Sequence, residues 1–405
     1  MATVIIAGVL GLFLWFWWGY EPKGQLDPKA QVQPDKKYTV VFWDFDRPLP
    51  GGASYREELV REIELFNQKF PNITVELKLF PWTHGEQVAA AIRRRQEVPH
   101  ILSLGPLESL DFARDLLLPA SYLPEETRLD FVPLALSGPE FEHKTAVWPR
   151  FLAPQLYLAN TDLLQAVGVN RSGLQEQGID WADILHLGRE LIQLEGQPHA
   201  LAGLDYQGLL VALAPRQPDS LGPEQFSWPR SAADTAVARL RQLQADNFLP
   251  PNIDQADYGG VKEFFTGQAA LLAPAEPWLL RTVRARQEQI KHGLLPATDR
   301  GLGEVALIPP KLTPSAGLPA RVEGLVVFRW RLAADEIKAA VEWAQHLSRS
   351  GTLPAKLDLL PAYRPSQDAW SAAWELGNEA VLLGVCEQGQ RLAPYPKTRL
   401  EGIDS

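Results

Sequence analysis

The spacing of apolar and polar positions after residue 37 indicates a parallel sheet covered by helices. Residues 38–45 (YTVVFWDF) form a β-branched and aromatic run that predicts a buried strand. Residues 55–70 carry apolar side chains on one helical face, and residues 73–80 alternate as a second strand. A helix at 86–95 and a short strand at 101–104 follow. This order is that of a parallel α/β unit, which binds ligands beyond the carboxyl ends of its strands.

After residue 141 the pattern of apolar and polar positions again predicts helices and strands, with a different spacing along the chain. Amphipathic helices are predicted at 181–194, 232–243 and 335–347, and a buried strand is predicted at 324–328. We find no short-period repeat, which argues against solenoids and propellers. With 405 residues the chain is long enough for two domains. The pattern therefore predicts two α/β units in succession.

The start of the chain has a different character. Residues 3–20 form an uncharged apolar run that is long enough to cross a bilayer. The far end of this run carries Trp15, Trp17, Trp18 and Tyr20, the aromatic belt expected at a lipid–water boundary. A cleaved signal peptide is the alternative, but it requires a basic beginning and small residues at the cleavage site. The sequence has neither, because Ala2 and Thr3 precede the run and bulky indoles stand at its far end. We therefore predict a transmembrane anchor at 1–22.

A polar, proline-containing linker at 23–37 follows the apolar run. Four lysines lie in this linker: Lys23, Lys29, Lys36 and Lys37. Positive charge collects on the cytoplasmic side of membrane proteins, so this rule by itself places the body in the cytoplasm.

Composition limits the classes of function. The apolar content of 46% is that of a folded globular protein. The formal net charge of −10 argues against a nucleic-acid partner, because that binding needs a basic face. Cys386 is the only cysteine, which excludes an internal disulfide framework and a cysteine-rich metal site.

Motifs for catalysis are also missing from the sequence. The seven histidines are scattered without metal-ligand spacing. There is no nucleophile elbow, no phosphate-binding loop and no dinucleotide fingerprint after the first strand. Carboxylates distant in sequence can still pair in a fold, which keeps an enzyme open as an alternative. We predict no enzymatic activity, no cofactor and no metal.

The tryptophans are the more informative residues. The chain has thirteen, and five stand in loop-like or helix-start contexts: Trp43, Trp82, Trp148, Trp278 and Trp370. Aromatic platforms with nearby charged groups suit sugars, whose apolar faces are rimmed by hydroxyls. The alternative for each tryptophan is that it fills the core or an interface.

Several segments together resemble the extracellular solute-binding proteins of family 1, the maltodextrin-binding-like receptors of ABC importers. They follow the order of that family across residues 38–385. The segments are 38–45, 58–82, 146–169, 261–278 (VKEFFTGQAALLAPAEPW), 306–310, 322–328, 339–352 and 359–366. The sequence departs from the family pattern at 96–101, at Glu276 and in the proline-containing tail at 386–405.

The resemblance implies an α/β fold with two doubly wound lobes joined by a hinge, a type II periplasmic-binding-protein arrangement. Lobe 1 is expected to comprise 38–150 and 312–350, and lobe 2 to comprise 151–311 and 351–405. The family places its body outside the cytoplasm, so we expect an extracytoplasmic body in spite of the lysines. Closure around a ligand would present both lobes to permease subunits.

The same resemblance implies the ligand contacts. They lie after the first and third strands, at the two crossovers, at the stacking tryptophan of the family and in the last ligand loop. The expected residues are Asp44, Phe45, Asp46, Gly105, Glu108, Arg150, Trp278, Glu323, Arg364, Trp370 and Trp374. The expected function is capture of a carbohydrate or related polar solute for an ABC importer. The alternative is a fold that has lost its ligand and serves as a structural subunit of a membrane complex.

Overall fold

A computed structural model describes the body of the chain. The described residues are 27, 29–47, 49, 54–105, 118, 128–136, 140–141, 144–145, 147–203, 206–214, 230–251, 259–275, 277–294, 303–311, 319–374, 382–383 and 390–391. The predicted anchor at 1–22 lies outside these residues. Within them, no helix is both long and apolar enough to span a membrane.

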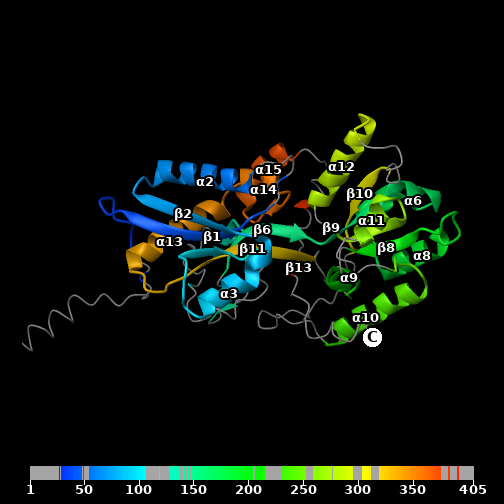
Figure 1. The fold of residues 1–405 in the computed structure, drawn as a ribbon, viewed down its shortest axis with the longest axis horizontal. Helices are drawn as coiled ribbons and strands as arrows, with labels where there is room; N and C mark the ends of the chain where they lie inside the picture. The colour runs from blue at the N-terminus through cyan, green and yellow to red at the C-terminus, as the bar shows by residue number, and fades with distance from the viewer. Residues whose placement is uncertain are drawn as a thin grey trace, which may run out of the picture.

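The larger of two α/β bodies is built on a seven-stranded sheet (Figure 1). Its strand order is β12-β6-β11-β3-β1-β2, with β13 paired to β11. The strands are β1 (Tyr38–Phe45), β2 (Ile73–Phe80), β3 (Ile101–Ser103), β6 (Trp148–Pro154), β11 (Pro319–Val327), β12 (Leu360–Pro361) and β13 (Gln390–Arg391). β1 runs parallel to β2 and β3, whereas β11 runs antiparallel to both β3 and β6. The parallel unit predicted at the start of the body is confirmed, and the crossing strands make the sheet mixed.

Helices cover both faces of this sheet because successive residues of a strand point to opposite sides. On one face Phe42 contacts Trp343 of α13 (Ala334–Ser348), whose indole also meets Phe66 of α2 (Tyr55–Lys69). On the other face Trp43 and Phe45 pack with the apolar side of α3 (Gly85–Arg93). α3 ends at Arg93, two residues before the end of the helix predicted over 86–95.

The second body contains a four-stranded sheet with the order β10-β7-β9-β8. Its strands are β7 (Leu156–Asn160), β8 (His199–Gly203), β9 (Ala269–Ala275) and β10 (Val305–Ile308). Its helices are α6 (Thr161–Ala166), α7 (Arg171–Gln177), α8 (Trp181–Leu191), α9 (Tyr206–Leu213), α10 (Arg230–Ala245), α11 (Gly259–Phe265) and α12 (Pro277–Lys291). The helix expected at 181–194 begins with a capping box made by Asp180 and Asp183.

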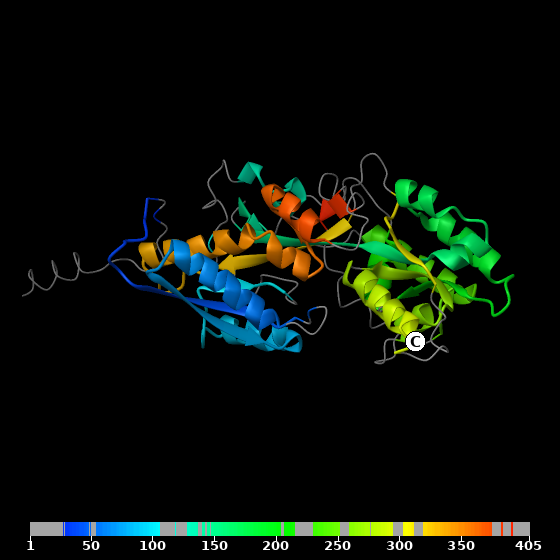
Figure 2. The same ribbon diagram turned by 90° about the horizontal axis from the view of Figure 1, so that it is seen from above.

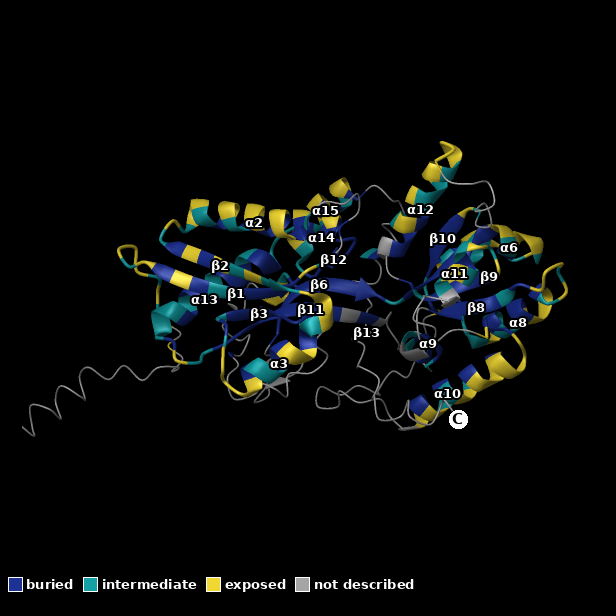
Figure 3. Cartoon of the chain, viewed as in Figure 1, coloured by how far each residue is buried: buried dark blue, intermediate teal, exposed yellow. Residues whose placement is uncertain are grey.

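The two bodies lie side by side along the long axis of the molecule (Figure 2). The chain crosses between them where β6 of the larger sheet continues into β7 of the smaller one. It returns after β10, when β11 re-enters the larger sheet beside β6. The central strands of both sheets are buried, whereas the edge strand β2 carries exposed residues and the helices expose their outer sides (Figure 3). A mixed α/β fold with two crossings is thus observed.

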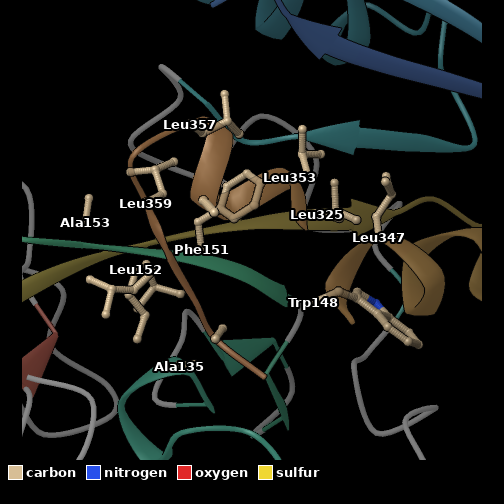
Figure 4. Packing of buried hydrophobic residues seen from close by; sticks show 14 of the residues in the cluster. Ala135, Trp148, Phe151, Leu152, Ala153, Leu325, Leu347, Leu353, Leu357 and Leu359 are labelled. Carbon is tan, nitrogen blue, oxygen red and sulfur yellow. The ribbon is translucent and has the colours of Figure 1, made fainter. Parts of the chain in front are cut away.

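The segment after residue 351 differs from the expected division of the lobes. We expected 351–405 to belong to lobe 2, whereas β12 forms its hydrogen bonds with β6 in the larger sheet. The helices α14 (Thr352–Lys356) and α15 (Gln367–Ala373) flank β12 and pack into the core of the larger body. Figure 4 shows Leu353, Leu357 and Leu359 around Phe151 of β6. Strand pairing with β6, which sequence order does not reveal, decides where this segment lies.

Short elements complete the described chain. They are η2 (Trp82–His84), α5 (Pro133–Leu136), the hairpin of β4 (Glu140–Phe141) and β5 (Lys144–Thr145), and η6 (Arg364–Ser366). Of these, η2 follows directly on the carboxyl end of β2.

Candidate functional site

A buried ion pair lies at the carboxyl end of β1. Arg150 of β6 donates from Nη1 to Asp44 Oδ2 at 3.0 Å, and both side chains are essentially inaccessible. The Tyr55 hydroxyl donates to the same oxygen at 2.7 Å, and the Phe45 amide donates to Asp44 Oδ1 at 2.8 Å. Both carboxylate oxygens of Asp44 are therefore engaged inside the protein.

A second ion pair lies next to the first. Arg47 follows β1 and donates to the carboxylate of Glu323 on β11. The Arg47 side chain is 9% exposed, and its guanidinium lies 4.8 Å from the ring centre of Trp82. Phe151 of β6 lies on it as well, at 5.9 Å. Arg47 thus joins the loop after β1 to both strands that cross between the bodies.

The electrostatics of this network keep the guanidinium groups charged. Burial alone would lower the pKa of Arg47, but the nearby Glu323 carboxylate reverses this and raises it. Burial likewise opposes the charge of Arg150, and the neighbouring Tyr55 and Asp44 raise its pKa. Burial, as the largest cause, also raises the pKa of the Tyr55 hydroxyl, which therefore stays protonated and donates to Asp44.

Trp82 stands at the exposed rim of this network. Of the tryptophans whose side chains the structure describes, it alone is exposed, at 37%. Gly105, just beyond β3, has a positive φ of 43° and packs closely against the same corner. A Cβ atom there would lie 2.8 Å from Phe45 and 3.4 Å from Trp82, so glycine is required for this close approach. The exposed indole is therefore held at the carboxyl edge of the larger sheet.

Several residues expected to contact a ligand lie together at this edge. Asp44, Arg150 and Glu323 are there, but each is buried and ion-paired within the protein. Phe45 is fully buried in the core beneath Trp82. Asp46 is exposed, with one oxygen accepting the Arg47 amide at 3.0 Å.

Other expected residues lie elsewhere. Trp370 and Trp374 stack with ring centres 5.0 Å apart, but they are 0% and 4% exposed, so neither presents a face to solvent. Arg364 is in η6, where its backbone amide donates to Asp130. Glu108 lies outside the described residues. Trp278 is in the first turn of α12, and its side chain is outside what the structure describes.

Of the five tryptophans singled out in the sequence, the four whose side chains the structure describes divide into two groups. Trp43, Trp148 and Trp370 are core residues, as the packing alternative held. Trp82 is the exposed one, and the family pattern did not include it among the ligand contacts. Arg47 was also not predicted, although its position directly after Asp46 in the sequence was a usable signal.

The rim therefore consists of an exposed indole and an exposed carboxylate, and the largely buried guanidinium of Arg47 lies against the indole ring. This combination suits an uncharged polar ligand with an apolar face, which can stack on the ring and hydrogen-bond to charged groups. In the described part of the chain, no group of three or more His, Cys, Asp or Glu side chains could hold a metal ion.

Comparison with known proteins identifies the fold. No protein-family model matches the sequence, and no curated protein matches it. Solved structures do match over most of the chain. The sugar-binding protein MalE of Xanthomonas citri aligns with a TM-score of 0.66 and 16% identity, over 89% of this chain and 88% of its own.

Two further structures agree with the first. The GacH receptor of Streptomyces glaucescens, solved unliganded and with acarbose, has a TM-score of 0.60 and 19% identity over 91% of this chain and 90% of its own. The cyclic α-maltosyl-1,6-maltose binding protein of Arthrobacter globiformis has a TM-score of 0.63 and 14% identity over 89% and 88%. The chain therefore has the fold of the maltose- and oligosaccharide-binding proteins of ABC importers.

Proposed function

We propose that this protein, whose fold is that of oligosaccharide-binding proteins, is an extracytoplasmic receptor that captures a carbohydrate for an ABC importer. The observation that carries the proposal is Trp82, exposed at the carboxyl edge of the larger sheet with Arg47 on its ring. This edge is where open α/β sheets bind their ligands. Solved proteins of the same fold are described as binding maltose and acarbose.

The ligand is a sugar rather than an ion in this proposal. The charges beneath the rim are compensated, because Asp44 pairs with Arg150 and Glu323 with Arg47. A neutral solute with one apolar face loses less hydration on such a surface than a charged solute does. Asp46 supplies acceptor oxygens for the hydroxyl groups at the edge of the sugar ring.

Membrane attachment and delivery to a permease belong to the same proposal. The apolar run at 3–20 is the anchor, and the linker at 23–37 holds the body away from the membrane. ABC permease subunits are the partners. Protease treatment of sealed vesicles tests the sidedness: digestion of the body from outside supports it, and a protected body overturns it.

Calorimetric titration of the full chain in detergent with malto-oligosaccharides and other sugars tests ligand capture. Trp82→Ala is expected to weaken sugar binding by at least ten-fold, because a central tryptophan typically contributes about 2 kcal/mol or more to an interface. Trp330→Ala, at the opposite end of the larger sheet, is the matched control and should leave binding unchanged. If Trp82→Ala binds every sugar as well as the unaltered chain does, this site assignment is wrong.

One observation favours the second candidate function, a structural subunit without a ligand. Asp44 pairs with Arg150 and Glu323 pairs with Arg47 inside the protein. The side chains of Asp44, Arg150 and Glu323 are at most 4% exposed. A fold that had lost its ligand could keep such a network for stability alone. Failure of all sugars to bind, together with copurification of a membrane complex through the body, would favour this candidate.

A further inference from the structure

The end of the larger body opposite Trp82 carries a second arrangement of arginine and tryptophan. Trp330 follows β11 and is half-buried. The guanidinium of Arg95 lies 4.6 Å from its ring centre, and that of Arg331 lies 5.0 Å away. Both arginines have a positive φ, 53° and 58°, a conformation that is uncommon for residues other than glycine. The backbone thus turns at two separate places beside the same indole.

More positive charge surrounds this indole. Arg93 ends α3 and Arg94 caps it, and both are exposed together with Arg95 and Arg331. Arg329 precedes Trp330 directly and is half-buried. We call Arg93, Arg94, Arg95, Arg329 and Arg331, with Trp330, the arginine patch. Such a concentration is notable in a chain whose net charge is −10.

Nearby acidic groups are already engaged. Glu97 accepts from Lys78 Nζ at 3.0 Å. Asp335 accepts from Lys36 and from the Tyr38 hydroxyl, at 2.6 and 3.0 Å. Glu336 accepts the backbone amide of Ala333. Glu97 and Asp335 thus pair with lysines that lie outside the arginine patch, while Arg93, Arg94 and Arg331 are exposed and give this end of the body a positive field.

The position of the patch is set by the topology of the sheet. It surrounds the amino end of β3 and the carboxyl end of β11, where the Phe328 amide donates to His100. Tyr38 begins β1 at this same end, and its hydroxyl reaches Asp335, four residues after Arg331. Figure 1 shows the start of β1 and the start of α13 at one end of the body. The chain thus enters the body beside the patch.

The linker is short and partly docked. The Gln33 amide donates to Tyr38, and the Asn72 side chain donates to the carbonyls of Gln33 and Lys36. Val32 also packs against the core of the larger body, so residues 23–31 are left to bridge an anchor and the body. About ten residues span ~35 Å at most when fully extended. An anchor at 3–20 would therefore hold the arginine patch close to the membrane surface.

We propose that the arginine patch docks on the anionic phospholipid headgroups of the membrane that holds the anchor. This inference rests on the proposed membrane attachment. Guanidinium groups match phosphate oxygens with paired hydrogen bonds, and an indole between them suits the headgroup region. Docking at this end turns the carboxyl edge with Trp82 away from the lipid, because the patch lies at the amino end of the parallel strands.

The experiment compares the full chain in nanodiscs of neutral phosphatidylcholine with the full chain in discs that also contain phosphatidylglycerol. Phenylglyoxal modifies accessible arginines, and mass spectrometry follows each one. Arg93, Arg94 and Arg331 are expected to react at least five-fold more slowly in anionic discs, because each basic residue near an anionic surface contributes about that factor. High salt should restore the rate. Arg189 and Arg241, exposed on the second body, are internal controls whose rates should not change.

A double variant tests cooperation within the patch. Arg94→Ser with Arg331→Ser should remove most of the protection of Arg93, whereas Arg189→Ser with Arg241→Ser should leave it intact.

Equal rates for Arg93 in neutral and anionic discs would overturn the inference, and protection that needs an added acidic protein would assign the patch to a protein partner instead. Incorporation into neither disc would defeat the anchor and the docking together. Binding to anionic discs alone would defeat only the anchor.

Discussion

Two indoles at opposite ends of the larger sheet each lie against arginine, yet their surroundings differ. At the carboxyl edge, Arg47 on Trp82 is 9% exposed and pairs with Glu323. At the amino edge, Arg95 and Arg331 on Trp330 are exposed, and Glu97 and Asp335 at that end pair with Lys78 and Lys36. The same contact between a cation and a ring thus occurs once inside a compensated network and once on a charged surface.

The difference lies in the cost of desolvation. A buried guanidinium is stable only with a carboxylate beside it, so Arg47 and Arg150 are bound to the fold that surrounds them. An exposed guanidinium keeps its water and remains available to a partner. We therefore expect substitutions of the buried charges at the carboxyl edge to change stability, and substitutions of the exposed arginines at the amino edge to change docking on the membrane.

The largest effect is expected from breaking the Asp44–Arg150 pair. Asp44→Ala leaves Arg150 buried without its carboxylate, and it should lower the free energy of unfolding by about 3–5 kcal/mol. Denaturant unfolding followed by circular dichroism measures the change. Asp46→Asn, a neighbouring exposed carboxylate, is the control and should stay within about 0.5 kcal/mol. Asp44→Leu with Arg150→Met should recover most of the loss; a double variant as unstable as Asp44→Ala would contradict this account.

A smaller loss is expected at the second pair. Glu323→Gln removes the charge that compensates Arg47 but keeps one hydrogen-bond acceptor, so we expect a loss of about 2 kcal/mol. The matched control is Glu304→Gln, because Glu304 is 69% exposed and pairs with Arg171 on the surface. That control should cost less than about 0.5 kcal/mol. Equal losses from the two variants would show that burial does not distinguish these pairs.

A pH dependence is expected at the amino edge. Burial raises the pKa of Asp335, but the hydrogen bonds from Lys36 and Tyr38 outweigh it and leave the pKa lowered. A carboxyl group whose pKa is lower in the folded state stabilises the fold above its unfolded value, near pH 4, and loses that contribution as the pH falls further. Because Lys36 is 40% exposed, we expect Asp335→Asn to cost less than about 1 kcal/mol at neutral pH.

Unfolding free energies measured between pH 3 and pH 7 check this expectation. The deficit of Asp335→Asn relative to the unaltered chain should shrink toward the acid end. A deficit that stays constant over this range would mean that the charge of Asp335 plays no part.

The smallest change in stability is expected in the arginine patch itself. Arg331→Ser should alter the free energy of unfolding by no more than about 0.5 kcal/mol, because the side chain is exposed. Arg47→Ser provides the contrast, since it leaves Glu323 buried without its ion pair. If Arg331→Ser proves as destabilising as Arg47→Ser, the arginine patch is a structural element rather than a binding surface.

The local spacing of apolar and polar residues was sufficient to predict several strands and helices of the fold. The runs at 38–45 and 73–80 became β1 and β2 with the expected bounds, because alternation and β-branched content report directly on a strand with a buried face. The helix at 335–347 matched α13 to within a residue at each end. The segment after residue 351 could not be placed in this way, since strand order in a sheet depends on contacts between distant residues.

The site was predicted less completely. The resemblance brought Asp44, Arg150 and Glu323 to one edge, and the structure places them there. It did not show that Asp44 pairs with Arg150 and Glu323 with Arg47, because pairing is a matter of distances between separate strands. For the same reason it pointed to Trp370 rather than Trp82, since exposure depends on what the rest of the chain leaves uncovered.

The sequence by itself therefore determined many of the helices and strands and the apolar run at 3–20. Only the tertiary structure decided which charges are compensated and which indole is exposed. Alternation and helical spacing act over a few neighbouring residues and can be read along the chain. Burial and ion pairing join residues more than a hundred positions apart, as in Asp44 with Arg150 and Arg47 with Glu323, and they arise only when the strands assemble.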